Sequence, residues 1–211
     1  MAVVPVAGEV VPPWLRTRLE GLTWPRRTHR LRLRPLRTDD VDAVLAYRSL
    51  PDVVVHLSHD VLDRPAVEAR VEGWIARGRP GSPAPLLGLA VEEQASGRVV
   101  GDVMLRLEPS HSISRTPTAE WEGTIGYALH PDVHSRGFAA EAATELLVLG
   151  FRELGLRRIT ADAYAANVAS NRVLRRIGMR HETTVRAKSL GKDGTWLDDN
   201  IWALLREEWS G

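Results

Sequence analysis

A turn that leads into a helix carries the residues best suited to chemistry, residues 134–140 (HSRGFAA). Gly137 and the small residues after it lie where an apolar-faced helix is predicted to begin. The first amides of a helix have no internal acceptor, and the helix dipole adds positive charge there. Small residues in such a turn let a phosphate contact the backbone itself. The turn therefore predicts a diphosphate site, to which Arg136 adds charge.

The same turn also has a purely structural interpretation. A tight connection between a strand and a helix can require Gly137 only for its backbone conformation. The residues match neither the phosphate loop GxxxxGKS/T nor the dinucleotide fingerprint GxGxxG. Both of those nucleotide-binding classes are therefore excluded, and the flanking sequence must decide between an anion site and a plain turn.

Strands and helices on both sides position this turn. A strand is predicted over residues 120–130, with Ile125, Tyr127 and Leu129 on one face, and the helix after the turn runs from about residue 138 to 154. Periodicity and cap residues (Thr38, Asp63 and Asn167) place the other elements: strands over 29–36, 85–93, 98–108, 157–163, 180–190 and 195–205, helices over 12–22, 38–50, 63–78 and 167–179, and a loop over 109–119. The order predicts a mixed sheet with helices on its faces.

Several motifs in sequence order resemble one known superfamily. Residues 125–182, the front segment HRLRLRPLRTDDVDAVLAY, the pattern N-x-x-S-x-R-V-L from Asn167 to Leu174 and the final DGTWLDDNIWALLREEW are similar to GNAT acetyltransferases. Their acetyl-CoA loop reads Q/R-x-x-G-x-G/A, where this chain has His134 in the first position. The flanks resemble the RimJ/RimL-like branch, which acetylates the N-terminal alanine of ribosomal proteins. The resemblance covers about residues 29–209.

The resemblance implies an α/β fold, the GNAT acyl-CoA N-acyltransferase fold. Its central sheet is mostly antiparallel and splayed at the cofactor site, with helices on both faces. A GNAT domain over residues 29–211 would follow an N-terminal extension over 1–28, whose tryptophans pack on the domain. Acetyl-CoA would be the cosubstrate, with no metal. The residues implied for its binding are Leu129, His134, Ser135, Arg136, Gly137, Phe138, Ala139, Asn167 and Arg172.

The resemblance also implies direct transfer of the acetyl group to a primary amine. Ser170 resembles the serine that this branch offers to the leaving thiolate, although a serine in the first turn of a helix capped by Asn167 has a structural explanation too. Glu122 and Glu120 are the leading candidates for the base, against the alternative of solvated charges at a strand end. His56, His59, His130, Asp198 and Asp199 are further polar options, and Trp121 and Trp196 are candidates for the substrate wall.

Composition narrows the alternatives. The 28 basic and 27 acidic residues give a net charge of +1, which favours no nucleic acid partner. The absence of cysteine excludes disulfides and a thiol nucleophile. No membrane span or signal peptide is indicated, so a cytoplasmic location is expected. The acceptor, a small amine or a protein N-terminus, stays open, as do a longer acyl donor such as succinyl-CoA, a non-catalytic acyl-CoA sensor, and a homodimer paired through edge strands.

Overall fold

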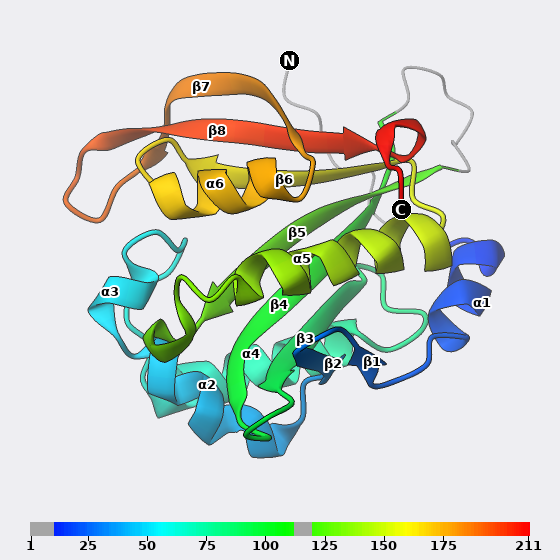
Figure 1. Cartoon of the computed structure of the whole chain (residues 1–211), viewed down its shortest axis with the longest axis horizontal. Helices are drawn as coiled ribbons and strands as arrows, with labels where there is room; N and C mark the ends of the chain where they lie inside the picture. The colour runs from blue at the N-terminus through cyan, green and yellow to red at the C-terminus, as the bar shows by residue number, and fades with distance from the viewer. Residues whose placement is uncertain (1–10, 112–119) are drawn as a thin grey trace.

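An eight-stranded sheet forms the centre of the computed structural model, which describes residues 11–111 and 120–211 (Figure 1). The strand order is β1-β2-β3-β4-β5-β6-β8-β7, and every neighbouring pair is antiparallel except β5 and β6. The strands are β1 Arg26–Arg27, β2 Leu31–Pro35, β3 Leu86–Glu93, β4 Val99–Pro109, β5 Trp121–Leu129, β6 Arg158–Tyr164, β7 Arg180–Leu190 and β8 Trp196–Leu205. The predicted mostly antiparallel, mixed sheet is confirmed.

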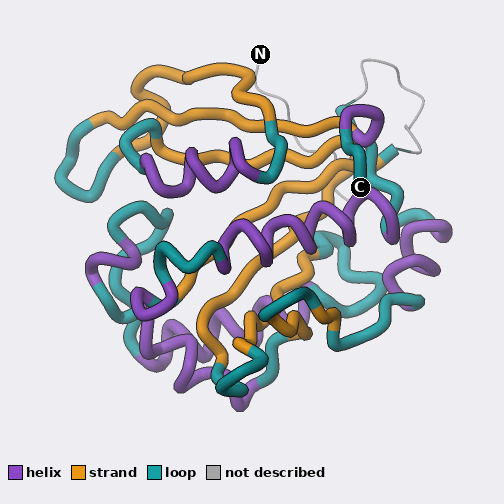
Figure 2. The backbone as a smooth tube through the Cα atoms, in the orientation of Figure 1, coloured by secondary structure: helices purple, strands orange, loops and turns teal. Residues whose placement is uncertain are grey.

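Helices lie in front of and behind this sheet (Figure 2). They are α1 Pro13–Glu20, α2 Val41–Arg48, α3 Pro51–Val54, α4 Arg64–Arg77, α5 Phe138–Val148 and α6 Val168–Arg176. On one face α2 packs on β4 and α4 on β3, while on the other α5 crosses β2, β4 and β5. Shorter turns complete the chain: η1 Thr38–Asp40, η2 Pro131–Val133, η3 Leu149–Glu153 and η4 Arg206–Glu208. Within residues 11–111 and 120–211, none of the helices has the length and apolar character that a bilayer crossing requires.

Two of the three predicted helix caps are confirmed. The Asp63 carboxylate accepts a hydrogen bond from the Ala66 amide at 3.0 Å, and the side chain of Asn167 accepts one from the Ser170 amide at 3.0 Å. The prediction for Thr38 was wrong, because η1 precedes α2 and the helix begins at Val41.

Asp40 replaces Thr38 at the start of α2. One carboxylate oxygen of Asp40 accepts from the Arg37 amide at 2.7 Å, and both oxygens bind the Arg34 guanidinium at 2.7 Å. A charge-assisted, bidentate pair outweighs a single bond from a hydroxyl, so the chain turns at the aspartate.

The helix after the glycine turn also differs from its prediction. It is α-helical only to Val148, and residues Leu149–Glu153 continue it as a π-helix with a bond from the Leu154 amide to the Leu149 carbonyl. Apolar periodicity in a sequence indicates how far a helix extends, but it does not reveal which hydrogen bonds the helix forms. The length was therefore predicted, and the change from α-helix to π-helix was not. Two short elements, β1 and α3, were also not predicted.

The N-terminal segment packs against the domain. The side chain of Leu15 in α1 is fully buried, and Trp14 and Trp24 contact the same core as the buried face of α5. The division at residue 28 stays a prediction, although β1 pairs with β2 across it. The predicted loop over residues 109–119 lies mainly outside the described residues.

The buried carboxylate of Glu92, on β3, leads to a prediction of how stability depends on pH. Glu92 accepts hydrogen bonds from Arg34 and Arg32, each at 2.5 Å. Burial acts to raise the pKa of Glu92, but these two guanidinium groups outweigh it and hold the pKa below its usual value. A carboxylate with a depressed pKa stabilises the fold above its unfolded pKa, and this contribution is lost as pH falls through the folded pKa.

Glu92→Gln is therefore expected to lower the free energy of unfolding by about 2 kcal/mol near pH 7, where the charged bonds are lost. The difference from the original protein should shrink as the pH falls from about 5 towards 3, which urea unfolding at several pH values measures. A difference independent of pH would show that shape, and not charge, gives Glu92 its effect.

Candidate active site

The sheet opens at the one parallel pair of strands. β5 and β6 pair only from Glu122 to Thr124 and from Arg158 to Thr160, and the two threonine hydroxyls lie 3.1 Å apart. Beyond these residues β5 continues to Leu129, paired with β4 on its other side, while β6 pairs only with β8. The β6-facing edge of β5 from Ile125 to Leu129 therefore has no partner strand. This wedge exposes backbone donors and acceptors inside the molecule.

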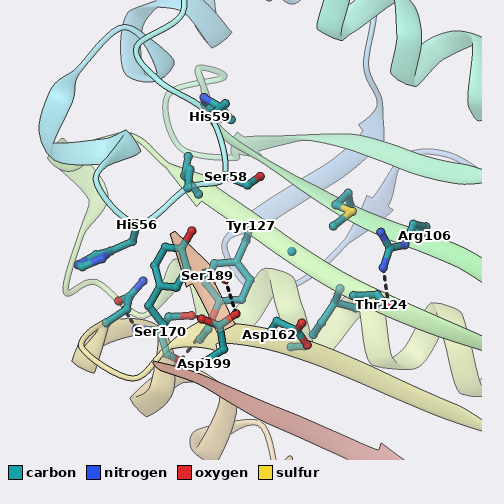
Figure 3. Close-up of a pocket in the computed structure, with 18 of the residues that line it drawn as sticks. His56, Ser58, His59, Arg106, Thr124, Tyr127, Asp162, Ser170, Ser189 and Asp199 are labelled. Atoms are coloured by element: carbon teal, nitrogen blue, oxygen red, sulfur yellow. Dashed lines mark hydrogen bonds between the residues drawn. The ribbon is translucent and has the colours of Figure 1, made fainter. Parts of the chain in front are cut away.

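A cavity of about 450 Å³, called the central pocket below, occupies the open side of this wedge (Figure 3). His56, Ser58 and His59, after α3, lie on one side of it, opposite residues of β6, α6 and β8. Its size is that of pockets that enclose small molecules. Polar groups from segments far apart in the sequence converge in it.

A hydroxyl pair lies on the wall of the central pocket. Tyr127 of β5 and Ser170 of α6 both line it, and their oxygens are 2.8 Å apart. Burial raises the pKa of Tyr127 to about 12, although the bond to Ser170 acts against this. The phenol therefore stays protonated at neutral pH and can donate to Ser170 Oγ, which leaves the serine hydrogen free to point into the pocket.

The N-terminal turn of α6 holds Ser170 in place. Asn171, its neighbour, donates to the carbonyls of Tyr164 and Asn167 and accepts from the side chains of Asn200 and Trp202, all within 3.0 Å. These bonds attach α6 to β6 and β8. Because the Asn167 cap uses the Ser170 amide and not its hydroxyl, the hydroxyl stays available.

Asp199 of β8 supplies a carboxylate to the same pocket. Its side chain is buried, and Oδ2 accepts from Ser189 Oγ at 2.8 Å, with Lys188 Nζ at 3.6 Å. Oδ1 is buried with no hydrogen-bond partner among the described residues. Lys188 binds Asp162 more closely, at 2.7 Å, so Asp199 has no close ion pair and one oxygen with unused hydrogen-bonding capacity.

A buried charge cluster forms the opposite wall. Asp102 of β4 accepts from Tyr47 at 2.5 Å and from two nitrogens of Arg48, and all three residues are at most 2% exposed. Arg48 Nη1 also lies 2.7 Å from His59 Nε2, and His59 Nδ1 lies 2.8 Å from the Asp60 carbonyl. Because a guanidinium only donates, Nε2 accepts and His59 is the neutral tautomer protonated at Nδ1. Burial lowers the pKa of His59, in agreement with this assignment.

The predicted anion site has the backbone that such a site needs. Gly137 precedes α5 with φ 81°, and Ser135 has φ 60°. Among the described residues, no backbone carbonyl accepts from the amides of residues 135–140. A Cβ built on Gly137 would meet only Arg30 Nη2, at 3.4 Å, so this side of the turn is open. Successive free amides around a left-handed residue form an anion-binding concavity, so the turn fits a diphosphate.

Charged contacts hold the turn from outside. Glu141, in the first turn of α5, accepts from Thr28 Oγ1, the Arg30 amide and Arg30 Nε at 2.5–2.8 Å. Arg30 also donates to the Arg136 carbonyl at 2.7 Å, and Arg136 binds Glu93 at 2.6 Å. His134 Nε2 lies 3.0 Å from the Leu129 carbonyl, which connects the turn to the end of β5. The turn is thus fixed before any ligand arrives.

The structure brings together only some of the residues predicted for catalysis. Ser170 lines the central pocket, as do three of the further polar options, His56, His59 and Asp199. Glu120 and Glu122 do not line it. Glu122 lies at the closed end of the wedge and binds Arg157, with Arg158 Nε at 3.7 Å, while Glu120 lies 3.7 Å from Arg157.

The residues predicted for cofactor binding form two groups. Leu129 and residues 134–139 lie together around the start of α5, and Asn167 lines the central pocket. Arg172 is exposed on α6 and borders a separate groove between α6 and β8, so the structure does not bring it to the turn or to the pocket.

Four further residues that the sequence suggested for the acceptor site lie outside the central pocket. Asp198 and His130 do not line the pocket; Asp198 accepts from the Ala187 amide and His130 from the Asp132 amide. Trp121 is buried in the core and Trp196 is 63% exposed, so neither forms a pocket wall, whereas Trp74 does. Sequence reasoning missed Tyr127, Arg70 and the Asp102 cluster as site residues. An acidic residue inside the apolar run VVGDVML was the available signal for Asp102.

Comparison with known proteins identifies acetyltransferases as relatives of this chain. The sequence profile of the acetyltransferase (GNAT) domain matches residues 30–180. The chain is 40% identical to the uncharacterized N-acetyltransferase YnaD of Bacillus subtilis over 86 residues, which cover 41% of this chain and 50% of YnaD. A GNAT-family acetyltransferase structure from Bacillus anthracis superposes with a TM-score of 0.72 at 26% identity, over 88% of this chain and all of that one.

The RimJ structure of Mycobacterium smegmatis, a complex with CoA-disulfide, superposes with a TM-score of 0.67 at 23% identity, over 86% of this chain and 84% of that one. At this identity the likeness concerns the fold. The match to YnaD spans only half of that relative's length.

Proposed function

Because this chain belongs to the GNAT acetyltransferase family, we propose that it transfers the acetyl group of acetyl-CoA directly to a primary amine in the central pocket. The observation that carries the proposal is the pair of Ser170 and Tyr127, which lines this pocket beside the unpaired edge of β5. A hydroxyl held there can donate a proton to a departing thiolate. Acetyl-CoA, when bound, supplies the thioester carbonyl that the amine attacks.

The glycine turn would hold the diphosphate of the donor. Residues 135–140 offer amides that no backbone carbonyl of the described residues accepts from, and Arg136 lies among them. Between the turn and the pocket, the unpaired edge of β5 near Leu129 would direct a main-chain amide at the thioester carbonyl, as an oxyanion site does. The unpartnered backbone of the wedge thereby gains a hydrogen-bonding role.

Proton movements follow from the two sides of the pocket. An amine that arrives as an ammonium ion must lose one proton before it attacks, and Asp199, whose side chain lines the pocket, is the carboxylate that would accept it. As the new C–N bond forms and the C–S bond breaks, the nitrogen releases its second proton to solvent, Ser170 Oγ donates to the sulfur, and Tyr127 replaces the proton on the serine and regains its own from solvent. Glu120 and Glu122, predicted as bases, lie at the other end of the wedge, so we assign this role to Asp199.

A thiol-release screen tests the proposed function. Acetyl-CoA and succinyl-CoA are each offered with small amines and with peptides that have a free N-terminus, and free CoA thiol is measured. Amine-dependent release with acetyl-CoA supports the proposal. Tight CoA binding without amine-dependent release across the panel would indicate a sensor, and release only with succinyl-CoA would replace the donor.

The turn gives a prediction for donor binding. Gly137→Ala is expected to weaken CoA binding by about 10-fold, because a side chain disfavours left-handed φ by about 1–2 kcal/mol and the free turn then leaves the conformation that directs its amides at the diphosphate. Isothermal titration calorimetry measures the effect. Gly194→Ala is the matched control, since Gly194 has φ 82° and nothing within 4 Å of a built Cβ, far from the turn. Equal affinity in both variants would contradict a diphosphate site at Gly137.

A further inference from the structure

Arg70 of α4 is a cation on the wall of the central pocket, and the described part of the chain gives it no hydrogen bond or close ion pair. Its guanidinium stacks on the Trp74 ring, with 4.6 Å from Cζ to the ring centroid. Its Nε is buried without a hydrogen bond, and no ion pair to Arg70 occurs within residues 11–111 and 120–211. The contact with Trp74 positions the guanidinium, while its Nε hydrogen has no acceptor.

The neighbouring carboxylate cannot satisfy Arg70. Both oxygens of Asp102 already accept from Arg48, and Oδ2 accepts from Tyr47 as well. Two guanidinium groups therefore share one carboxylate. Burial and the charge of Arg48 lower the pKa of Arg70 to about 10, so the group is still charged at neutral pH. A partly buried, unpaired guanidinium destabilises a protein unless a ligand supplies the missing acceptor.

The pocket wall also includes a carboxylate of the opposite sign, Asp199, whose oxygen Oδ1 is buried without a hydrogen-bond partner among the described residues. An occupant with an amine alone would satisfy Asp199 and leave Arg70 unpaired. A polyamine would add further positive charge beside Arg48 and Arg70. A molecule with one amine and one carboxylate satisfies both groups, and a planar guanidinium can bind a carboxylate through two parallel bonds.

We infer that the acceptor is a small molecule that carries a carboxylate besides its primary amine, and that Arg70 binds this carboxylate while the amine faces Asp199 and Ser170. The inference rests on the proposed function for the fate of the amine. The anion site at Arg70 does not depend on it. A cavity of about 450 Å³ suits an amino acid or a similarly small zwitterion.

Equilibrium binding tests the anion site without turnover. The full chain, saturated with CoA, is titrated calorimetrically with α-amino acids and with 4-aminobutyrate, and then with the carboxamide of each. At least one carboxylate should bind about 10- to 100-fold more tightly than its carboxamide, the range for hydrogen bonds to a charged group. Arg70→Met should remove this preference, and Arg70→Lys should retain part of it.

Arg77→Gln is the matched control, because Arg77 lies on the same helix, donates to the Ala84 carbonyl and does not line the pocket. It should keep the preference for the carboxylate. Thermal unfolding gives an independent readout: Arg70→Met should leave Tm unchanged or raise it by about 2–4 °C, since an unpaired charge is removed. A lower Tm with the preference intact would assign Arg70 a structural role and overturn the inference.

Thiol release separates the two proposals. Acetylation of neutral amines, with the same preference in the original protein and in Arg70→Met, would leave acetyl transfer standing and overturn the anionic acceptor. Carboxylate binding that Arg70→Met removes, without thiol release, would confirm the anion site and contradict catalysis. The inference also fails if no carboxylate binds better than its carboxamide, or if a peptide with an amidated C-terminus is preferred to every small zwitterion.

Discussion

Replacing Ser170 with alanine is expected to lower kcat by about 100-fold, at the lower end of the range for loss of a positioned acid. The hydroxyl is the group of the central pocket that both contacts Tyr127, at 2.8 Å, and faces the wedge where the thioester would lie. The affinity for CoA should change little, because the free amides that would hold its diphosphate lie in the turn before α5. Steady-state kinetics with calorimetric CoA titration separates the two effects.

The hydrogen bonds in the first turn of α6 make the effect of Ser170→Ala easy to interpret. The Asn167 cap accepts from the Ser170 amide, which alanine retains, so the helix and its attachment through Asn171 should persist. Ser170→Thr keeps a hydroxyl and should recover part of the loss, whereas Tyr127→Phe removes the second proton donor and should reduce kcat less than the alanine variant. An unchanged kcat in Ser170→Ala would rule out the serine as the acid.

Asp102→Ala is expected to lower the free energy of unfolding by about 3–5 kcal/mol, the range for breaking a buried ion pair from one side. Arg48 is 2% exposed and Asp102 1%, so removal of the carboxylate leaves Arg48 charged and unpaired in the core. Tyr47 loses its acceptor at the same time. Urea unfolding followed by circular dichroism measures the change.

An exposed aspartate provides the contrast. Asp42 pairs with Arg64 at the surface, with an 80% exposed side chain, so Asp42→Ala should leave the urea midpoint unchanged. The double variant Asp102→Leu with Arg48→Met removes both charges and should recover much of the lost stability. If Asp102→Ala and Asp42→Ala shift the urea midpoint equally, the buried pair of Asp102 and Arg48 contributes no more to stability than the surface pair.

Local signals in the sequence predicted most of the fold. Alternation of apolar residues located β7 and β8, and the Asp-Gly pair at Asp193 located the hairpin turn between them. The caps at Asp63 and Asn167 were predicted because a side chain three residues from a free amide is a local feature. For the same reason the turn at Gly137 could be predicted as a structure with open amides.

The partners inside the site could not be predicted in the same way. Glu122 and Asp199 are both carboxylates on strands, and only the point where β5 separates from β6 determines which of them faces the pocket. That point depends on packing between segments far apart in the chain. Asp102 and Arg48 are likewise 54 residues apart, so neither local pattern reveals that they form one pair. Sequence reasoning located the glycine turn and Ser170, while the side of the pocket formed by Asp199, Arg70 and the Asp102 cluster needed the three-dimensional arrangement.

The short parallel pairing of β5 with β6 has a mechanical consequence. Each side of it has its own continuous ladder, β1 to β5 and β6 to β8. Within residues 11–111 and 120–211, the two ladders are joined by the pairing of Glu122–Thr124 with Arg158–Thr160 and by the bond from the Arg157 amide to the Trp121 carbonyl. Away from this junction the two sides are held together by side-chain contacts, such as Tyr127 with Ser170 and Lys192 with the carbonyls of Val54 and His59, and not by ladder bonds. A change in the width of the wedge would therefore break side-chain contacts alone and leave every strand of both ladders paired.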